Sequence, residues 1–166
     1  MLLAGEVPAP IRRVLPLLVR FEGLFLTVYL CPAGVPTIGL GSTRYADGRR
    51  VALGDPPITA EHAYLLAVHQ LRTKYLPAVL RLCPGADSFD SFDRIAALLD
   101  FTYNLGVGAL AASTLRRRVN AGDWAGAQRE IRRWTQGGGR TLRGLVIRRA
   151  VEAALLERAA GLPAAP

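Results

Sequence analysis

A carboxylate, a thiol and a hydroxyl follow one another at short spacing near the start of the chain. Glu22 stands beside Phe21 at the end of a predicted helix, and Cys31 and Thr37 come nine and fifteen residues later. A carboxyl group among apolar side chains is partly desolvated, which favours the protonated form that a general acid needs. We therefore predict that Glu22 is a general acid. Cys31 and Thr37 are predicted to face it across a cleft and to hold a water molecule together.

One reaction that uses such groups is hydrolysis of a glycosidic bond. It normally needs two carboxyl groups: one protonates the leaving oxygen, and the other activates water or attacks the sugar. Here Glu22 is the only carboxylate between Phe21 and Thr43. Taken singly, Glu22, Cys31 and Thr37 are better explained as a solvated helix end, a small buried hydrophobe and an ordinary strand residue. The prediction depends on their combination.

A helix and a small sheet are needed to place these groups. Apolar residues recur at three- and four-residue steps over 11–21, which predicts an amphipathic helix that ends next to Glu22. From 22 to 58, β-branched, aromatic and glycine residues alternate with turn signals at 32–36 and at Asp47-Gly48. This pattern predicts a compact β-rich lobe built on an antiparallel hairpin.

The pattern over 59–160 predicts a helical lobe. Thr59 is the predicted N-cap of a long helix whose apolar stripe, which includes Tyr64 and Leu65, ends at Pro77. Three further helices are predicted over 91–104, 113–120 and 123–134, each with a Ser or Asp cap, and a last one over 142–160. The glycine-rich segment 136–140 is predicted to be a mobile loop. The fold class is therefore α+β, in a single domain of residues 1–166.

As a whole, the sequence resembles the phage-type lysozymes of glycoside hydrolase family 24. The family pattern is Glu, eight residues, Asp or Cys, five residues and Thr, followed by Ile-Gly-x-Gly-x-Thr. Glu22, Cys31 and Thr37 have this spacing, and 38–43 match the rest. Further motifs of the family's helical lobe follow in the same order, over 101–108, 113–115, 120–124, Trp134 and 144–152. The resemblance spans about residues 11–156.

The resemblance implies a lysozyme-like two-lobed fold and hydrolysis of the β-1,4 bond between N-acetylmuramic acid and N-acetylglucosamine, with inversion. Glu22 would protonate the glycosidic oxygen, and Thr37 would orient the attacking water. Cys31 takes the position of the carboxylate that polarises this water. A thiol with the ordinary pKa of about 8.5 is mostly protonated at pH 7, so Cys31 is expected to act as an electrostatic or hydrogen-bonding partner. Its action as a thiolate or a nucleophile stays an open alternative.

Four more residues would line the sugar cleft according to the same resemblance. Tyr103 and Asn104 would supply an apolar face and an amide, which suit acetamido sugars, although a core tyrosine and a helix-end asparagine explain them nearly as well. Gly39 and Gly41 would let a strand approach the substrate closely. A tight turn or a bulge at these glycines is compatible with that role.

Other residues that could do chemistry have simpler explanations. His62 and His69 lie two turns apart without a further ligand at suitable spacing, so we predict no metal site, and no cofactor. Trp124 and Trp134 are predicted to be core anchors rather than sugar platforms. Cys83 is a candidate to pair with Cys31 under oxidising conditions, and such a disulfide would consume the predicted catalytic thiol.

The formal net charge is +8, from 21 Lys and Arg against 13 Asp and Glu. A charge of this sign favours a polyanionic partner, although a solvated Arg-rich surface explains it equally well. No nucleic-acid recognition motif accompanies the charge, so we predict no nucleic-acid partner. Arginines in and around the last predicted helix are expected to contact an anionic outer membrane: Arg140, Arg143, Arg148, Arg149 and Arg158.

Prolines and arginines interrupt the apolar residues over 8–16, so neither a signal peptide nor a transmembrane helix is predicted. Two cysteines are too few for a disulfide scaffold, which fits synthesis in the reducing cytoplasm of a host. A substrate outside that compartment then requires an external release route to the periplasm, for which we expect a holin. We expect the protein to be a monomer that acts on the glycan strands of peptidoglycan.

Two alternatives differ in what they need. A lytic transglycosylase cleaves the same bond with one acid and the sugar's own hydroxyl, so it would need Glu22 but neither Cys31 nor Thr37. A cationic module that binds a membrane or nucleic acid would not need Glu22 at all. Replacing Glu22 by Gln separates these classes, because only an enzyme would lose its lytic activity.

Overall fold

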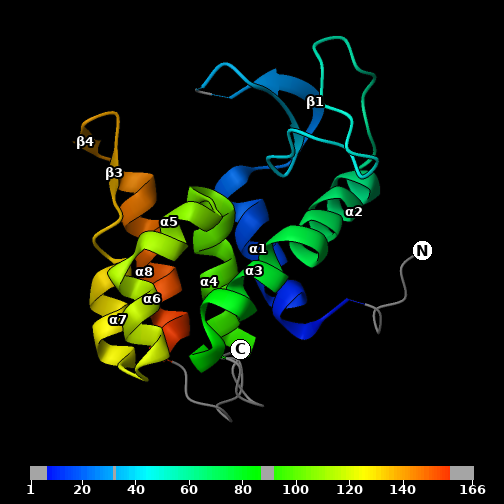
Figure 1. Ribbon diagram of the computed structural model, residues 1–166. Coiled ribbons are helices and arrows are strands. Elements are labelled where there is room, and N and C mark those ends of the chain that lie inside the picture. Colours follow the sequence, from blue (N-terminus) through cyan, green and yellow to red (C-terminus); the bar gives the residue numbers. More distant parts are fainter. Residues whose placement is uncertain (1–6, 32, 87–91, 158–166) are drawn as a thin grey trace, which may run out of the picture.

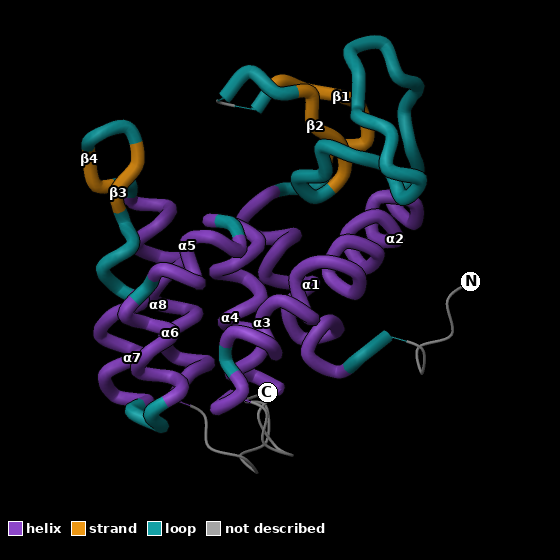
Figure 2. Tube along the Cα trace, in the orientation of Figure 1, coloured by secondary structure: helices purple, strands orange, loops and turns teal. Residues whose placement is uncertain are grey.

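The computed structural model describes residues 7–31, 33–86 and 92–157. Figure 1 shows a β-containing lobe above one end of α2 (Ala60–Gln70) and a larger helical lobe below it. Figure 2 shows that the strands are confined to the small lobe and to one hairpin on the other side of the molecule. The predicted α+β fold class is confirmed.

The first helix, α1 (Ala9–Glu22), ends on the predicted general acid. Its buried face consists of Ile11, Val14 and Leu18 together with Pro10, as the apolar spacing predicts. Gly23 follows with a φ of +78°, a conformation that residues with a side chain rarely adopt. The chain therefore turns away from the helix directly after Glu22, and this side chain stands where α1 passes into the β lobe.

The β lobe is built on the predicted antiparallel hairpin of β1 (Phe25–Leu30) and β2 (Pro36–Gly39). Tyr29 pairs with Thr37, so these two side chains belong to the same face of the hairpin. A shift in register lies between Phe25 and Tyr29. The lobe has its own small core, formed by Ile38, Val51 and Leu66.

A long helical segment leads from the β lobe into the helical lobe. It consists of α2, the π-helical turn η1 (Leu71–Tyr75) and α3 (Leu76–Leu82), and the Thr59 side chain caps it by accepting a hydrogen bond from the His62 N–H. The prediction that Pro77 ends this helix is wrong. Proline lacks an N–H and its ring crowds the preceding turn, and the wider π-turn directly before Pro77 leaves room for the ring.

The buried face of α2 also differs from the predicted stripe. Tyr64 and Leu65 are exposed, whereas Ala63, Leu66 and Ala67 are buried. Small alanines let α2 approach its neighbours closely, so the buried face includes residues that a search for large apolar side chains does not select.

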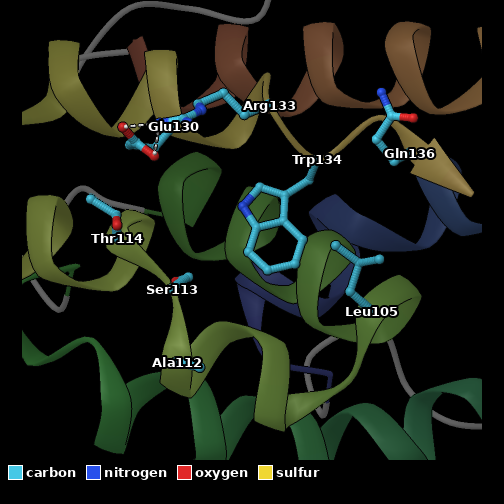
Figure 3. Close-up of a pocket in the computed structure, with 8 residues that line it drawn as sticks. All are labelled: Leu105, Ala112, Ser113, Thr114, Glu130, Arg133, Trp134 and Gln136. Atoms are coloured by element: carbon cyan, nitrogen blue, oxygen red, sulfur yellow. Dashed lines mark hydrogen bonds and ion pairs between the residues drawn. The ribbon is translucent and has the colours of Figure 1, made fainter. Parts of the chain in front are cut away.

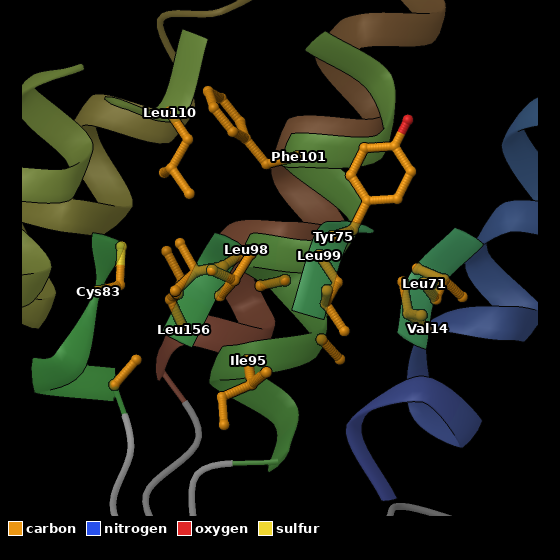
Figure 4. Packing of buried hydrophobic residues seen from close by; sticks show 14 of the residues in the cluster. Val14, Leu71, Tyr75, Cys83, Ile95, Leu98, Leu99, Phe101, Leu110 and Leu156 are labelled. Carbon is orange, nitrogen blue, oxygen red and sulfur yellow. The ribbon is translucent and has the colours of Figure 1, made fainter. Parts of the chain in front are cut away.

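The helical lobe surrounds α4 (Phe92–Leu105), whose residues from Ile95 to Thr102 are all buried. Figure 4 shows side chains from α1, η1 and α4 meeting in one core with Leu110 and Leu156. The elements around α4 are the short 3-10 turn η2 (Pro84–Ala86), α5 (Val107–Ala112), α6 (Thr114–Asn120), α7 (Trp124–Ile131) and α8 (Arg143–Glu157). Because α4 is covered on all sides, it is apolar around most of its circumference.

Besides Thr59, two of the three caps predicted for the following helices are confirmed. The Ser113 side chain accepts a hydrogen bond from the Arg116 N–H at 3.0 Å, and Asp123 accepts one from the Gly126 N–H at 2.8 Å. The helix that Asp123 caps ends at Ile131, whereas the sequence predicted an end at Trp134. The third predicted cap, Ser91, lies outside the described residues. The predicted core position of Trp134 is supported by its edge contact with Phe101, at 5.3 Å between ring centroids.

The segment predicted to be a mobile loop forms a hairpin. β3 (Gln136–Gly137) pairs with β4 (Arg140–Thr141), and Gly138 and Gly139 connect them with φ angles of +58° and +76°. Two consecutive positive φ angles match the twist of antiparallel strands, and glycine adopts them without strain. The glycines therefore specify a tight turn between two short strands.

Both cysteines are free thiols, so the predicted alternative of a Cys31–Cys83 disulfide is not realised. Cys83 belongs to the core of the helical lobe, and its burial raises the pKa of its thiol to about 11. Cys31 stands in the β lobe, next to the end of β1. Within the described ranges, every helix lacks either the length or the apolar character that spanning a bilayer would demand.

Candidate active site

Glu22 has one carboxylate oxygen held by an arginine and the other next to a glycine. Its Oε1 accepts a hydrogen bond from Arg148 Nη1 at 2.6 Å. A Cβ atom on Gly41 would lie 3.7 Å from Glu22 Oε2 and 3.7 Å from a ring carbon of Tyr103. Gly41 thus keeps a space open that is bordered by Glu22 and Tyr103. The Glu22 side chain is 22% exposed, which suits a group that must meet a substrate.

The surroundings of Glu22 differ from those that the sequence suggests. The apolar residues that follow it, Leu24 and Phe25, are exposed rather than packed over the carboxyl group. Its closest partner is instead Arg148, which lies 126 residues away in the chain. A guanidinium partner from α8 was missed because nothing in the local sequence around Glu22 indicates it.

Cys31 and Thr37 lie at the start of the β1–β2 turn and in β2, as predicted. Backbone N–H groups of Val35 and then Ala33 lower the pKa of the Cys31 thiol, against the effect of desolvation. Thr37 is buried and donates its hydroxyl hydrogen to the Val35 carbonyl at 2.9 Å. The turn thus favours the Cys31 thiolate more than water does.

Tyr29 connects the two parts of the site and was not predicted as a site residue. Burial raises the pKa of its phenol, and the negative charges of Glu22 and then Cys31 raise it further. Both groups are therefore within electrostatic reach of one side chain, which also pairs in register with Thr37. The ring of Phe25 stacks on it at 4.3 Å between centroids. The available signal was the alternation along β1, which places Tyr29 and Cys31 on the same face.

Tyr103 ties the helical lobe to the β lobe. Its hydroxyl donates a hydrogen bond to the Leu40 carbonyl at 2.7 Å, and its ring packs against Tyr75 at 5.0 Å between centroids. Desolvation raises the pKa of this phenol above its ordinary value, which keeps it a neutral donor. Because the Tyr103 hydroxyl is bonded to the Leu40 carbonyl, the part of Tyr103 that borders the space beside Gly41 is the edge of its ring.

The two predicted glycines have different surroundings. Gly39 has a φ of +68°, and a Cβ there would lie 3.3 Å from the Cβ of Ala63 in α2. Gly41 has a φ of +91° and faces Glu22 and Tyr103. Gly39 is therefore explained by close packing of the hairpin on α2, whereas Gly41 borders the space beside the carboxyl group.

A buried network of charges lies behind Glu22. Arg148 is 3% exposed and makes two hydrogen bonds to the Asp100 carboxylate, at 2.8 and 2.9 Å. Its neighbour Arg149 is fully buried. Arg149 Nη2 lies 3.0 Å from Glu152 Oε1 and donates a hydrogen bond to Asn104 Oδ1 at 2.9 Å. The network thus links Glu22 to Asn104 through residues of α4 and α8.

The network corrects the prediction that Arg148 and Arg149 form part of a cationic surface. Burial opposes the charge of Arg148, but Asp100 and Glu22 outweigh it and raise the pKa of Arg148 above its ordinary value. Burial, and then the neighbouring Asp100 carboxyl group, raise the pKa of Glu152 well above its ordinary value. In the core, Arg148 therefore faces Glu22 and Asp100, and Arg149 faces Glu152 and Asn104. Of the other arginines, Arg140 and Arg143 are exposed, and Arg158 lies outside the described residues.

A separate cavity of about 560 Å³ lies in the helical lobe beside the β3–β4 hairpin. Figure 3 shows the Trp134 ring at its centre, with Glu130 and Arg133 paired at one side. Its lining contains no residue that was predicted to belong to the site: Leu105, Ala112, Ser113, Thr114, Glu130, Arg133, Trp134 and Gln136. Within the part of the chain that is described, no three His, Cys, Asp or Glu residues come together as metal ligands would, and His62 and His69 have no third partner.

Known proteins resemble this chain in sequence and in fold. A sequence profile of the family described as Phage lysozyme matches residues 19–152. An endolysin of Acyrthosiphon pisum secondary endosymbiont phage 1 is 34% identical over 151 residues, which cover 87% of this chain and 95% of that protein. A SAR-endolysin of Enterobacteria phage PA-2 is 47% identical over 132 residues, or 79% of this chain and 74% of that one.

A solved structure supports the same conclusion. The endolysin from Escherichia coli O157:H7 phage FAHEc1 superposes with a TM-score of 0.76 at 34% identity, and the match covers 88% of this chain and 91% of that chain. The predicted lysozyme-like fold is therefore confirmed. The region that matches the family profile includes Glu22, Cys31, Thr37 and Arg148. The chain belongs to the phage lysozyme family, the glycoside hydrolases that degrade peptidoglycan.

Proposed function

We propose that this enzyme is an endolysin that hydrolyses the β-1,4 bond between N-acetylmuramic acid and N-acetylglucosamine, with inversion at the sugar. The observation that carries the proposal is the asymmetric setting of the Glu22 carboxyl group. Arg148 holds Oε1, while Oε2 borders the space that Gly41 leaves open. One oxygen is thus fixed by the protein and the other is available to a glycosidic oxygen.

In this mechanism Glu22 donates the proton that it carries on Oε2 to the leaving oxygen. Arg148 keeps the carboxyl group in place through Oε1, and Asp100 keeps Arg148 in place. Water attacks the opposite face of the sugar ring, and the anomeric configuration is inverted. The positive charge that develops on the sugar is stabilised by negative charge on the side of the water.

Cys31 supplies that negative charge, and Thr37 orients the water. The backbone donors of Val35 and Ala33 favour the thiolate, so Cys31 takes the role that a second carboxylate has in other glycosidases. The Thr37 hydroxyl can give its hydrogen to the Val35 carbonyl and accept one from the water through its oxygen. This leaves the water with a lone pair directed at the sugar, and the proton that the water loses on attack passes to the Cys31 thiolate. No covalent intermediate is required.

The predicted cleft residues Tyr103 and Asn104 bind the glycan in the same proposal, next to Gly41. The whole chain, residues 1–166, acts as one catalytic domain and as a monomer. It is made in the host cytoplasm and reaches the periplasm when a holin opens the inner membrane. Contact with an anionic outer membrane falls to exposed Arg140 and Arg143, because Arg148 and Arg149 are buried.

The test is digestion of purified peptidoglycan by the enzyme and by its Glu22→Gln variant, with the sugar ends identified by mass spectrometry. We expect the enzyme to produce reducing N-acetylmuramic acid ends. The variant should form them at least about 100-fold more slowly, because a positioned general acid contributes that much or more to the rate. The variant must retain the thermal unfolding midpoint of the parent. Anhydro ends would instead identify a lytic transglycosylase, and reducing N-acetylglucosamine ends would contradict the proposed bond.

The stereochemical part of the proposal has its own measurement. Proton NMR during the first minutes of digestion of a soluble glycan reports the anomer that forms first. We expect the α-anomer, because inversion of a β-1,4 bond produces it. The β-anomer as first product would replace water activation by a covalent intermediate on Cys31.

A further inference from the structure

Asn104 stands next to the buried network at the edge of the candidate site. It lies one helical turn after Asp100 in α4, and Asp100 binds the arginine that holds Glu22. The side chain of Asn104 is neither fully buried nor fully exposed. It can therefore contact the network on one side and a ligand on the other.

The amide of Asn104 has two chemically different ends, and one of them is engaged. Arg149 Nη2 donates a hydrogen bond to Asn104 Oδ1 at 2.9 Å. A guanidinium group has only donors, so a rotation of the amide by half a turn would bring two donors together. The oxygen is therefore committed to Arg149, and the Nδ2 hydrogens are directed away from it.

Arg149 cannot turn away from this contact. It is fully buried, lies 3.0 Å from Glu152 and covers the ring of Phe101 at 5.1 Å from the centroid. Among the described residues, its Nε and Nη1 atoms have no hydrogen-bond partner, so Asn104 provides the hydrogen bond that this guanidinium makes. Leaving such a buried group without a partner costs free energy. The hydrogen bond therefore fixes both the Arg149 guanidinium and the Asn104 amide.

We propose that Arg149, held by Glu152, is a positioning residue that locks the Asn104 amide so that its N–H donors bind an amide carbonyl of the substrate. The inference rests on the proposed function, because it assumes that peptidoglycan occupies the space beside Glu22. Peptidoglycan offers amide carbonyls in the acetamido groups of its sugars and in its stem peptides. Asn104 is then a specificity-determining residue: it selects an acceptor and rejects a donor at the same place.

The sharpest variant is Asn104→Asp. It has nearly the same shape and keeps an oxygen on Arg149, but it presents a second acceptor where the amide presents donors. We expect KM on intact peptidoglycan to rise about tenfold, with kcat within about threefold, since one ligand hydrogen bond is lost and Glu22 is untouched. An unchanged KM in this variant would overturn the proposal.

Two altered substrates identify the carbonyl. One is peptidoglycan whose sugars have been de-N-acetylated, with a re-acetylated sample as its control, and the other is glycan stripped of stem peptides by an amidase. We expect the KM of the parent to rise about tenfold on one of these substrates. The KM of Asn104→Asp should not rise further on that same substrate. Equal losses by both proteins on both substrates would show that Asn104 contacts neither carbonyl.

The positioning role of Arg149 requires a second pair of variants. Arg149→Met releases the amide, and we expect KM to rise about threefold while Arg149→Lys, which retains a donor, restores most of the loss. Arg81→Gln is the matched control, because it removes one charge from an exposed position in α3. If Arg149→Met fails to fold, Asn104→Asp still decides whether the N–H donors of Asn104 bind the substrate. Failure of the proposed function would be distinct, because the parent itself would then release no reducing muramic acid ends.

Discussion

The two sides of the candidate site are stabilised in opposite ways. On the β lobe, Cys31 and Thr37 are held by backbone groups only a few residues away, within one turn of a hairpin. On the helical lobe, Glu22 is held by Arg148, which depends on Asp100 in a third helix. The first arrangement is local and partly exposed, and the second is non-local and buried. Substitutions should therefore damage catalysis on the β lobe, but catalysis and stability together on the helical lobe.

The largest effect is expected from Asp100→Asn. The substitution breaks the buried ion pair between Asp100 and Arg148 and leaves Arg148 with Glu22, and breaking a buried pair costs about 3 kcal/mol or more in free energy of unfolding. Urea denaturation measures this loss, and hydrolysis should fall with it because Arg148 loses its fixed position. Arg133→Gln is the matched control, since its ion pair with Glu130 is at the surface and its loss should change stability only slightly. Equal stability in both variants would contradict the buried network.

A smaller effect, confined to catalysis, is expected from Cys31→Ser. A serine hydroxyl stays neutral where the thiol ionises, so we expect kcat to fall about 10- to 100-fold with little change in the unfolding midpoint. Cys31→Asp should restore most of the activity. Full turnover of the Ser variant on purified peptidoglycan would rule out a role for the thiolate.

The same position predicts a pH dependence. Because the pKa of Cys31 is lowered, its thiolate forms at a lower pH than that of an ordinary thiol, and activity should rise as pH increases through this lowered pKa. In Cys31→Asp the rise should move to more acidic pH, since a carboxylic acid ionises earlier. The measurement is the pH profile of kcat for both proteins. If kcat rose over the same pH range in both proteins, a group other than residue 31 would control activity in that range.

The smallest effect concerns the pH dependence of stability. The pKa of Glu152 is raised in the folded state, so the folded protein keeps a proton that the unfolded chain releases above a pH of about 4.3. The stability that this proton contributes is fully present below that pH and falls as pH rises toward the folded-state pKa, by on the order of 1 kcal/mol per pH unit. Glu152→Gln should flatten this slope in urea unfolding between pH 5 and 7. An unchanged slope would mean that Glu152 is ionised in the core.

The β side of the site was predictable because its determinants are local. The β-branched and aromatic pattern with its turn signals predicted the hairpin, the spacing of Glu22, Cys31 and Thr37 predicted the groups, and the resemblance to phage-type lysozymes assigned them roles. The caps at Ser113 and Asp123 were predictable for the same reason, since a cap bonds within its own first turn. Tyr29 could have been found from the alternation along β1.

Other features depended on neighbours that local patterns do not reveal. Pro77 was expected to end a helix, but a π-turn directly before it lets the helix continue. Three glycines were expected to give mobility, but two of them adopt the positive φ angles of a tight hairpin turn. In both cases the residue type restricts the backbone to a few conformations, and the elements on either side select one of them.

The amino-acid sequence by itself determined the α+β class, the order of the first helix, the β lobe and the helical lobe, and the local pair of Cys31 and Thr37, because these follow from periodicity and short-range hydrogen bonds. Only the tertiary structure decided that Arg148 and Arg149 are buried and that they hold Glu22 and Asn104. The physical reason is that a buried charge is tolerated only beside its partners. The groups around the two arginines, Asp100 and Glu152, come together with Glu22 only when α1, α4 and α8 pack.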